Sequence, residues 1–157
     1  MINIIQGNLI QMIGQVPIQS LAHGCNCFNK MGAGFALQLA RRVPEVMGAD
    51  LATLPGNMKK LGTFSTCIAE GIMFYNLYTQ FFYGRTESHF DYMAFRTSLQ
   101  TAIEDAMSQG LTSMHMPMIG AGLAQGDWQS ILECIQTIDQ TICQNAFTIN
   151  IVEYVNG

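Results

Sequence analysis

Two glycine-rich turns, each lying between a strand-like apolar segment and a helix-like segment, constrain the fold of this chain more than any other feature. The turns are residues 31–34, Met-Gly-Ala-Gly, and residues 120–123, Gly-Ala-Gly-Leu. In an open α/β sheet such turns emerge at the carboxyl ends of parallel strands, where these sheets bind ligands. A single turn is explained by a tight connection that requires small residues. Two turns on neighbouring strands predict a clamp that holds a diphosphate from two sides.

Apolar periodicity along the chain predicts strands that alternate with helices. The expected strands are residues 1–6, 18–22, 63–69, 72–79, 113–118 and 147–155, and the expected helices are residues 33–43, 91–110 and a helix capped by Asp127. Residues 18–22 are expected to end in a loop at residues 23–34, and Glu70-Gly71 predicts a hairpin turn. This pattern predicts one domain over residues 1–157, a three-layer α/β/α sandwich with a mixed, centrally parallel sheet.

Charge and cysteine usage narrow the environment and the partners. Seven basic and eleven acidic residues give a formal net charge of −4, and no basic cluster exceeds the pairs Arg41-Arg42 and Lys59-Lys60. Duplex nucleic acid is therefore not expected as a partner. Five cysteines without a CxxC pair predict reduced thiols. Because no apolar run is long enough to span a membrane, we expect a cytoplasmic monomer, in the host cytoplasm if a phage encodes it.

Three common ligand sites are not supported by the residue pattern. The first turn continues into Phe35 and lacks the third small residue of the dinucleotide fingerprint. Neither turn is followed by the lysine of a phosphate-binding P-loop. His23, His89 and His115 are scattered, so no metal site is predicted. We therefore expect neither a metal nor a cofactor.

Five short motifs in a fixed order resemble the macro domain family. They are Gly7-Asn8-Leu9, Ala22-His23-Gly24-Cys25-Asn26-Cys27, Met31-Gly32-Ala33-Gly34, Asn76-Leu77-Tyr78-Thr79-Gln80, and Pro117-Met118-Ile119-Gly120-Ala121-Gly122-Leu123 followed by Trp128. The resemblance covers essentially the whole chain and is to the small single-domain branch, common in phages and microbes, that processes ADP-ribose 1″-phosphate. It implies an α/β/α fold with ADP-ribose in a cleft across the top of the sheet.

The resemblance also implies roles for individual residues. Asn8 and the Leu9 backbone would meet the adenine edge, although the family more often has aspartate at the position of Asn8. Tyr154 is the candidate aromatic side chain against adenine, and Asn26 would bind hydroxyls of the distal ribose. The remaining ligand-binding candidates would enclose the diphosphate and distal ribose: Met31, Gly32, Ala33, Gly34, Thr79, Gln80, Ile119, Gly120, Ala121, Gly122 and Leu123.

His23 is the candidate for catalysis, together with Asn26. Histidine titrates near neutral pH, so it can serve as an acid, a base or a nucleophile, and a histidine at this place is implicated in the phosphatase branch that the motif resembles. The alternative is a histidine that only positions the Asn26 loop. Some relatives use a lysine at the strand end and an acid after the second loop. Here these places hold Gln80 and Ala124, which disfavours that lysine-dependent chemistry.

The expected function is binding of ADP-ribose and metal-independent hydrolysis of ADP-ribose 1″-phosphate to ADP-ribose and phosphate. Two alternatives stay open. One is a non-catalytic ADP-ribose-binding module. The other is a hydrolase of mono-ADP-ribosyl esters or O-acetyl-ADP-ribose.

Overall fold

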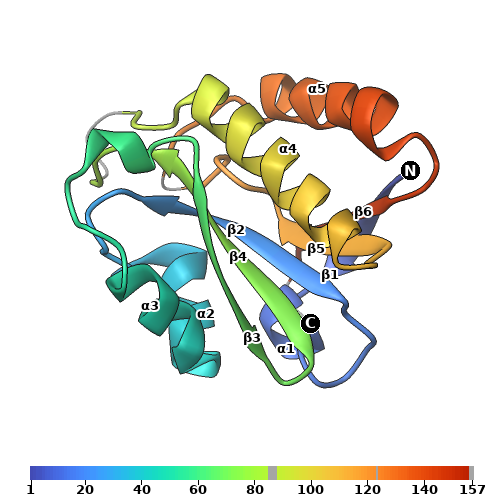
Figure 1. Cartoon of the computed structure of the whole chain (residues 1–157), viewed down its shortest axis with the longest axis horizontal. Helices are drawn as coiled ribbons and strands as arrows, with labels where there is room; N and C mark the ends of the chain where they lie inside the picture. Colours follow the sequence, from blue (N-terminus) through green and yellow to red (C-terminus); the bar gives the residue numbers. More distant parts are fainter. Residues whose placement is uncertain (85–87, 123, 156–157) are drawn as a thin grey trace.

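The chain folds around one mixed β-sheet (Figure 1). The computed structural model describes residues 1–84, 88–122 and 124–155. Within these residues six strands pair in the order β1-β6-β5-β2-β4-β3. The strands are β1 (Ile2–Gly7), β2 (Ser20–Asn26), β3 (Phe64–Ala69), β4 (Ile72–Gln80), β5 (Ser113–Pro117) and β6 (Thr148–Tyr154). The helices are α1 (Leu9–Met12), α2 (Gly34–Arg42), α3 (Pro44–Leu51), η1 (Met58–Lys60), α4 (Tyr92–Ser108), α5 (Trp128–Ile138) and η2 (Asp139–Cys143).

Strand direction confirms the predicted mixed sheet. The five strands from β1 to β4 in sheet order run parallel, and β3 pairs antiparallel with β4 as the predicted hairpin. Strands β2 and β5, which lead into the two glycine turns, are direct neighbours, with Leu21 opposite His115. Both turns therefore emerge at the same edge of the sheet, next to each other.

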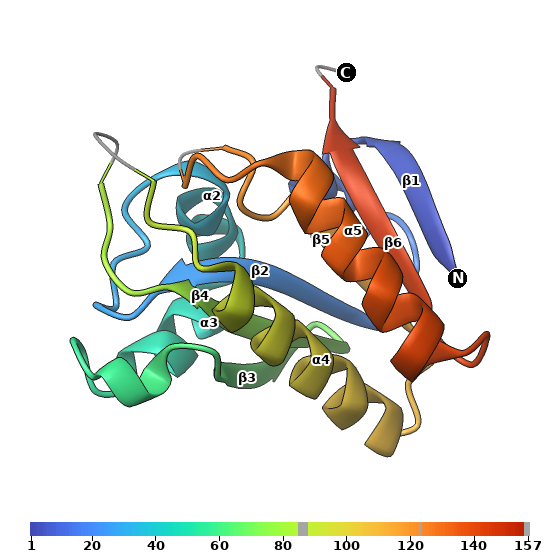
Figure 2. The same cartoon turned by 90° about the horizontal axis from the view of Figure 1, so that it is seen from above.

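Helices cover both faces of the sheet, which completes the predicted three-layer sandwich. Figures 1 and 2 show α4 and α5 on one face and α1, α2 and α3 on the other. The α4/α5 layer buries one apolar cluster that includes Leu77, Phe95 and Ile135. The opposite layer buries a second cluster that includes Leu21 and Leu39. No helix of the described residues is long and apolar enough to cross a membrane.

Side-chain caps fix where the helices of the α4/α5 layer begin, as predicted for α5. Asp91 accepts a hydrogen bond from the Ala94 amide (2.9 Å), and Asp127 accepts one from the Ser130 amide (3.2 Å). The start of α2 differs, because its N-cap residue Ala33 offers no side-chain hydrogen bond. The first turn of α2 therefore has no side chain to satisfy its amides.

The boundary of β2 corrects one prediction. The strand was expected to end at Ala22 and to open into a loop at His23, but it continues to Asn26. Its backbone stays paired with β4 as far as the register Asn26 to Gln80, with an irregularity after Cys25. The prediction was wrong because the polar His23 after an apolar run was interpreted as the start of a loop. In a central strand, a neighbouring strand can supply the hydrogen-bond partner that such a side chain needs, as Asn76 on β4 does here. His23 is thus a strand residue.

Candidate ligand-binding groove

Two adjoining cavities lie over the carboxyl ends of the parallel strands. The larger has a volume of about 670 Å³ and the smaller about 560 Å³, within the range usual for small-molecule sites. They share four lining residues, Phe35, Pro117, Met118 and Gly122. The two cavities therefore adjoin at these shared residues, and we refer to them together as the groove. We call the larger part the Asn26 cavity and the smaller part the Tyr154 cavity.

Every predicted site residue in the described part of the chain lines one of these cavities. The Asn26 cavity is lined by His23, Asn26, Met31, Gly32, Ala33, Gly34, Thr79, Gln80, Ile119, Gly120 and Gly122. The Tyr154 cavity is lined by Asn8, Leu9, Ala121, Gly122 and Tyr154. Leu123 lies outside the described residues. The structure thus brings together segments that are far apart in the sequence, while their contacts with a ligand stay predictions.

The first glycine turn places the N-terminus of α2 at the groove. Gly34 begins α2 and lines the Asn26 cavity, and Phe35 in the first turn lines both cavities. Amide groups at a helix N-terminus attract anions, because they are unpaired and carry the positive end of the helix dipole. Since α2 lacks a side-chain cap, this end is suited to a phosphate placed in the middle of the groove.

Two glycines on opposite walls leave open space where a side chain would be. A Cβ atom at Gly32 or at Gly122 would meet no atom within 4 Å, and neither residue has a positive φ that would require glycine. Neither packing nor backbone geometry explains these glycines in the free protein. The absence of side chains at these two positions leaves room for a ligand to approach the backbone closely.

Gly120 has a different reason for being glycine. Its φ is +83°, and a Cβ atom there would lie 2.5 Å from Phe90 Cε1 and 2.9 Å from Ile131 Cδ1. The Gly126 amide also donates to the Gly120 carbonyl (2.6 Å). Gly120 is therefore required by the fold of the second turn, whereas Gly122 faces the groove.

His23 is fully buried beneath the groove floor. Its Nε2 atom lies 2.6 Å from Asn76 Oδ1. The Asn76 amide nitrogen donates to the Val46 carbonyl (3.1 Å) and to Ser65 Oγ (3.0 Å). The Asn76 oxygen must then face His23, so the Nε2 atom of His23 carries the proton and donates. His23 Nδ1 is left as the acceptor in the ring.

Burial also decides the charge of His23. It lowers the pKa of the imidazole from 6.5 to about 4, and the hydrogen bond with Asn76 offsets only part of that effect. The imidazole is therefore neutral at pH 7. The Cys25 thiol lies 3.6 Å from Nε2 and 3.9 Å from Nδ1, and burial raises the pKa of this thiol well above its ordinary value. Cys25 is thus an un-ionised neighbour of His23, with no nucleophilic character.

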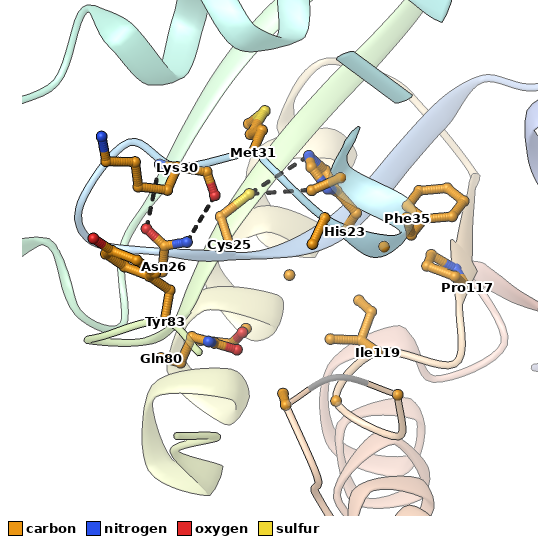
Figure 3. Close-up of a pocket in the computed structure, with 18 of the residues that line it drawn as sticks. His23, Cys25, Asn26, Lys30, Met31, Phe35, Gln80, Tyr83, Pro117 and Ile119 are labelled. Carbon is orange, nitrogen blue, oxygen red and sulfur yellow. Dashed lines mark hydrogen bonds between the residues drawn. The ribbon is translucent and has the colours of Figure 1, made fainter. Parts of the chain in front are cut away.

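Asn26 shapes the loop that forms one end of the larger cavity. Its Oδ1 accepts from the Phe28 amide (2.9 Å). Its Nδ2 donates to the Lys30 carbonyl (2.8 Å), as Figure 3 shows. One N–H of the side-chain amide is used in this way, and the amide has two. The second N–H can serve a ribose hydroxyl, as predicted from the resemblance.

Gln80 and Thr79 line the same cavity from β4. Thr79 is buried, and its side chain packs against Gly24. A Cβ atom added at Gly24 would lie 3.0 Å from Thr79 Oγ1. Gln80 donates through Nε2 to the Phe82 carbonyl (2.9 Å). Gln80 therefore holds the chain that follows β4.

The Tyr154 cavity contains the residues expected to meet adenine. Asn8 caps α1, because its Oδ1 accepts from the Gln11 amide (3.2 Å). The side-chain oxygen predicted to accept from the adenine amino group is thus already engaged, and its second lone pair remains for that role. Tyr154, at the end of β6, has 63% of its surface exposed and lines this cavity.

Several groove residues were missed from the sequence, among them Asp50 and Tyr83. Asp50, which is 1% exposed, lines the Asn26 cavity and accepts from the Tyr78 hydroxyl (2.8 Å). Tyr83 lines the same cavity beside Asn26 and Gln80 (Figure 3). Asp50 lies on α3 and belongs to no recognisable motif, so the neighbouring sequence gave no indication that it is a groove residue. The run of aromatic residues from 81 to 83 was a signal that could have found Tyr83.

The described residues contain no group of three or more His, Cys, Asp or Glu side chains arranged to hold a metal ion. What the groove offers instead is backbone amides, one buried carboxyl group and several amide side chains. Its middle suits an anion and its two ends suit polar rings. These features are suited to a nucleotide-like ligand with a diphosphate.

Comparison with known proteins gives the family. The macro domain family matches residues 22–135, and the chain belongs to this family. An uncharacterised 17.5 kDa protein from the tk-vs intergenic region of Enterobacteria phage T4 is 33% identical over 139 residues, which cover 85% of this chain and 86% of the relative.

Solved macro domains share the fold at low sequence identity. The macrodomain of Mycobacterium tuberculosis DarG aligns with a TM-score of 0.74 at 20% identity, covering 100% of this chain and 99% of that chain. Thermosipho africanus DarTG, solved in complex with ADP-ribose, aligns with a TM-score of 0.69 at 17% identity and covers 87% of this chain and 38% of that chain. The structural similarities support the fold, and the family match supports the assignment to the macro domain family.

Proposed function

We propose that this protein binds ADP-ribose along the groove. The adenosine lies in the Tyr154 cavity, the diphosphate at the shared middle, and the distal ribose in the Asn26 cavity. One observation carries the proposal: two adjoining cavities meet where the uncapped N-terminus of α2 and the open glycine Gly122 face the same space. The complex of the related DarTG with ADP-ribose supports the choice of ligand.

Calorimetric titration with ADP-ribose tests this proposal on the wild type and on Gly122→Phe. The phenyl ring enters open space in the middle of the groove, so the variant is expected to fold and to lose at least about tenfold in affinity, which corresponds to about 1.4 kcal/mol. Gly48→Ala is the matched control. A Cβ atom at Gly48 also meets open space, but this residue lies on α3 and outside both cavities.

Two results would contradict the proposal. Wild-type protein that releases no heat and shows no displacement of a labelled ADP-ribose would mean that the groove takes another ligand. Full affinity in folded Gly122→Phe would place ADP-ribose elsewhere on the molecule.

A second function of the same groove is hydrolysis of ADP-ribose 1″-phosphate. Two features favour it: the α2 amides at the groove and Lys30, an exposed cation that lines the Asn26 cavity. Both would stabilise negative charge on a phosphoryl group. Water attacks phosphorus, the bond between phosphorus and the 1″-oxygen breaks, and that oxygen leaves with a proton derived from the water. The products are phosphate and ADP-ribose.

The geometry of His23 limits its part in this reaction. Because its Nε2–H is engaged by Asn76 and its ring is neutral at pH 7, a chemical role would use Nδ1 as a proton acceptor. The alternative is a positioning role, in which the ring holds the β2 end that carries Asn26. Phosphate release by wild type and by His23→Ala separates these roles, with affinity for ADP-ribose measured on the same samples.

Each outcome of this assay has a distinct meaning. A loss of turnover of at least about a hundredfold at unchanged affinity supports a chemical role. Equal turnover in the variant removes His23 from the mechanism. Binding without phosphate release by the wild type leaves a non-catalytic ADP-ribose-binding module, unless the same assay with O-acetyl-ADP-ribose or a mono-ADP-ribosyl ester shows hydrolysis.

A further inference from the structure

A group of aromatic rings lies at the outer end of the Asn26 cavity, on the side away from the Tyr154 cavity. Figure 3 shows Tyr83 beside Asn26, opposite the end at which Phe35 and Pro117 border the second cavity. Next to Tyr83 lies Phe82, with ring centroids 4.5 Å apart. Phe82 and Tyr83 are 45% and 40% exposed. Two adjacent exposed rings beside a cavity are unusual on a protein surface, where they mark binding sites.

The rings are held from beneath by a third aromatic side chain. Phe28 makes edge contacts with Phe82 and Tyr83, at centroid distances of 5.2 and 6.1 Å, and with Phe81 at 5.0 Å. Gly56 closes the other side of Phe28, since a Cβ atom there would lie 3.2 Å from that ring. The Phe28 ring is therefore fixed between the cluster and a turn.

Backbone hydrogen bonds fix the same segment in place. The Phe81 carbonyl accepts from the Cys27 amide (3.0 Å), and the Phe82 carbonyl accepts from Gln80 Nε2 (2.9 Å). The Gly56 amide in turn donates to the Cys27 carbonyl (2.7 Å). Because these hydrogen bonds and the Phe28 contacts already hold the segment in the absence of a ligand, a flat group that packs against it should cost little conformational entropy.

We propose that Phe82 and Tyr83 form a stacking subsite for a planar heterocyclic ring attached to the anomeric carbon of the distal ribose. This inference rests on the proposed function, which places the distal ribose beside Asn26. The anomeric substituent then leaves the cavity toward Tyr83. Two neighbouring, partly exposed aromatic rings can recognise a flat π system by stacking, and a hydrated phosphate group does not use such a surface.

The charge of the chain favours a free dinucleotide-like molecule as the source of this ring. The net charge is −4, and the only basic pairs are Arg41-Arg42 and Lys59-Lys60. A nucleic-acid strand would need a basic path for its phosphates. A small ADP-ribose conjugate brings its own diphosphate to the α2 N-terminus and needs no such path.

The test compares ADP-ribose with NAD⁺, whose nicotinamide ring is the planar heterocycle at the anomeric carbon. Both the α and β anomers of NAD⁺ are titrated, so that either direction of the substituent is covered. The proteins are wild type, the double variant Phe82→Ala/Tyr83→Ala, and Tyr83→Phe, which keeps the ring. Met93→Ala removes another exposed side chain (72%) from α4 and serves as the control.

The expected result is a loss specific to the ring-bearing ligand. The double variant should bind one NAD⁺ anomer about tenfold or more weakly, while its affinity for ADP-ribose stays that of the wild type. Tyr83→Phe and Met93→Ala should bind both ligands normally.

Three results would overturn the subsite. Equal losses for ADP-ribose and NAD⁺ would show that the rings only support the cavity wall. Undiminished binding of both NAD⁺ anomers by the double variant, or wild type that binds ADP-ribose but neither anomer, would remove the subsite and leave the proposed function intact. Wild type that fails to bind ADP-ribose would overturn the proposed function and the subsite together.

Discussion

The surroundings of the buried His23 side chain determine its charge and its orientation. The motif around it marked a titratable residue at the groove, and the structure adds what the motif could not contain: a neighbouring strand whose Asn76 takes the Nε2 proton. The ring is therefore uncharged and oriented. Any function assigned to it has to be compatible with a neutral imidazole that has the Cys25 thiol beside both ring nitrogens, 3.6 Å from Nε2 and 3.9 Å from Nδ1.

The buried state of His23 makes stability depend on pH. Its pKa is about 4 when folded and about 6.5 when unfolded. Between these values the unfolded chain binds more protons, so the free energy of unfolding falls as the pH drops from 6.5 toward 4, and the His23 contribution is complete above 6.5. Urea denaturation should show roughly 2 kcal/mol of this loss by pH 5 in the wild type, and the loss should be absent in His23→Gln.

A second measurement keeps this prediction independent of how well the variant folds. An NMR titration of the wild-type imidazole should give a midpoint near pH 4 and the Nε2–H tautomer at pH 7. Burial lowers the pKa of His115 as well, so His115→Gln is the comparison variant. A midpoint close to 6.5 for His23 would contradict the assignment.

Gly120 and Gly122 differ in their expected response to the same substitution. Gly120→Ala would force a methyl group to within 2.5 Å of Phe90 at a positive φ, so we expect a loss of about 2 kcal/mol or more in the free energy of unfolding. Gly122→Ala meets open space and should change stability by less than about 0.5 kcal/mol. Chemical denaturation of both variants checks this contrast, and similar losses in the two would refute it.

At the scale of helices and strands, a boundary could be predicted from the sequence when nearby residues determine it. The hairpin of β3 and β4 and the Asp91 and Asp127 caps were predictable because turn and cap residues act on their immediate neighbours. The extent of β2 was not, since it depends on pairing with β4 some fifty residues away.

The same distinction between local features and packing of distant segments applies to the site. The two glycine turns and the ends of the groove could be predicted, because strand order brings the ends of β2 and β5 together. The place of Asp50 in the cavity wall could not, because it depends on how α3 packs against β4. Its partner Tyr78 had been marked only as part of a motif.

A buried polar cluster ties α3, η1 and the loop after β2 together. Lys60 Nζ donates to the Cys27 carbonyl (3.3 Å) and to Asn29 Oδ1, and it lies 4.6 Å from the centre of the Tyr78 ring. Asp50 accepts from the hydroxyl of the same tyrosine (2.8 Å). Burial raises the pKa of Asp50, while the Tyr78 hydrogen bond and the Lys60 charge act against that rise. Lys60 and Asp50 thus compensate each other's charge across one ring.

Removing both charges of this cluster should cost less than the sum of the losses from removing each one alone. Lys60→Met leaves Asp50 without its compensating cation, and we expect a loss on the order of 3 kcal/mol. The double variant Lys60→Met/Asp50→Asn should be less destabilised than the sum of the two single variants. Denaturation of the four proteins gives the coupling energy. Strict additivity would mean that the two charges do not interact.

On the scale of the whole molecule, the groove connects the two layers that flank the sheet. One wall comes from the turn that leads into α2 on one face, and the other comes from the turn that precedes α5 on the opposite face (Figures 1 and 2). Each layer has its own apolar cluster, and the sheet joins them. A ligand seated in the middle of the groove therefore contacts parts that are stabilised separately.

This arrangement predicts that ADP-ribose stabilises the domain as one unit. At a free ligand concentration of about 100 times Kd the gain is about 2.7 kcal/mol, which for a domain of this size raises Tm by about 5 to 10 °C. Because the ligand spans both layers, far-UV and near-UV circular dichroism should report the same shifted Tm. At the same ligand concentration Gly122→Phe should show at most about half of this shift, because its affinity is at least about tenfold lower, and Gly48→Ala should show the full one. A rise seen by one probe alone would mean that the ligand stabilises a single layer and does not bridge the two.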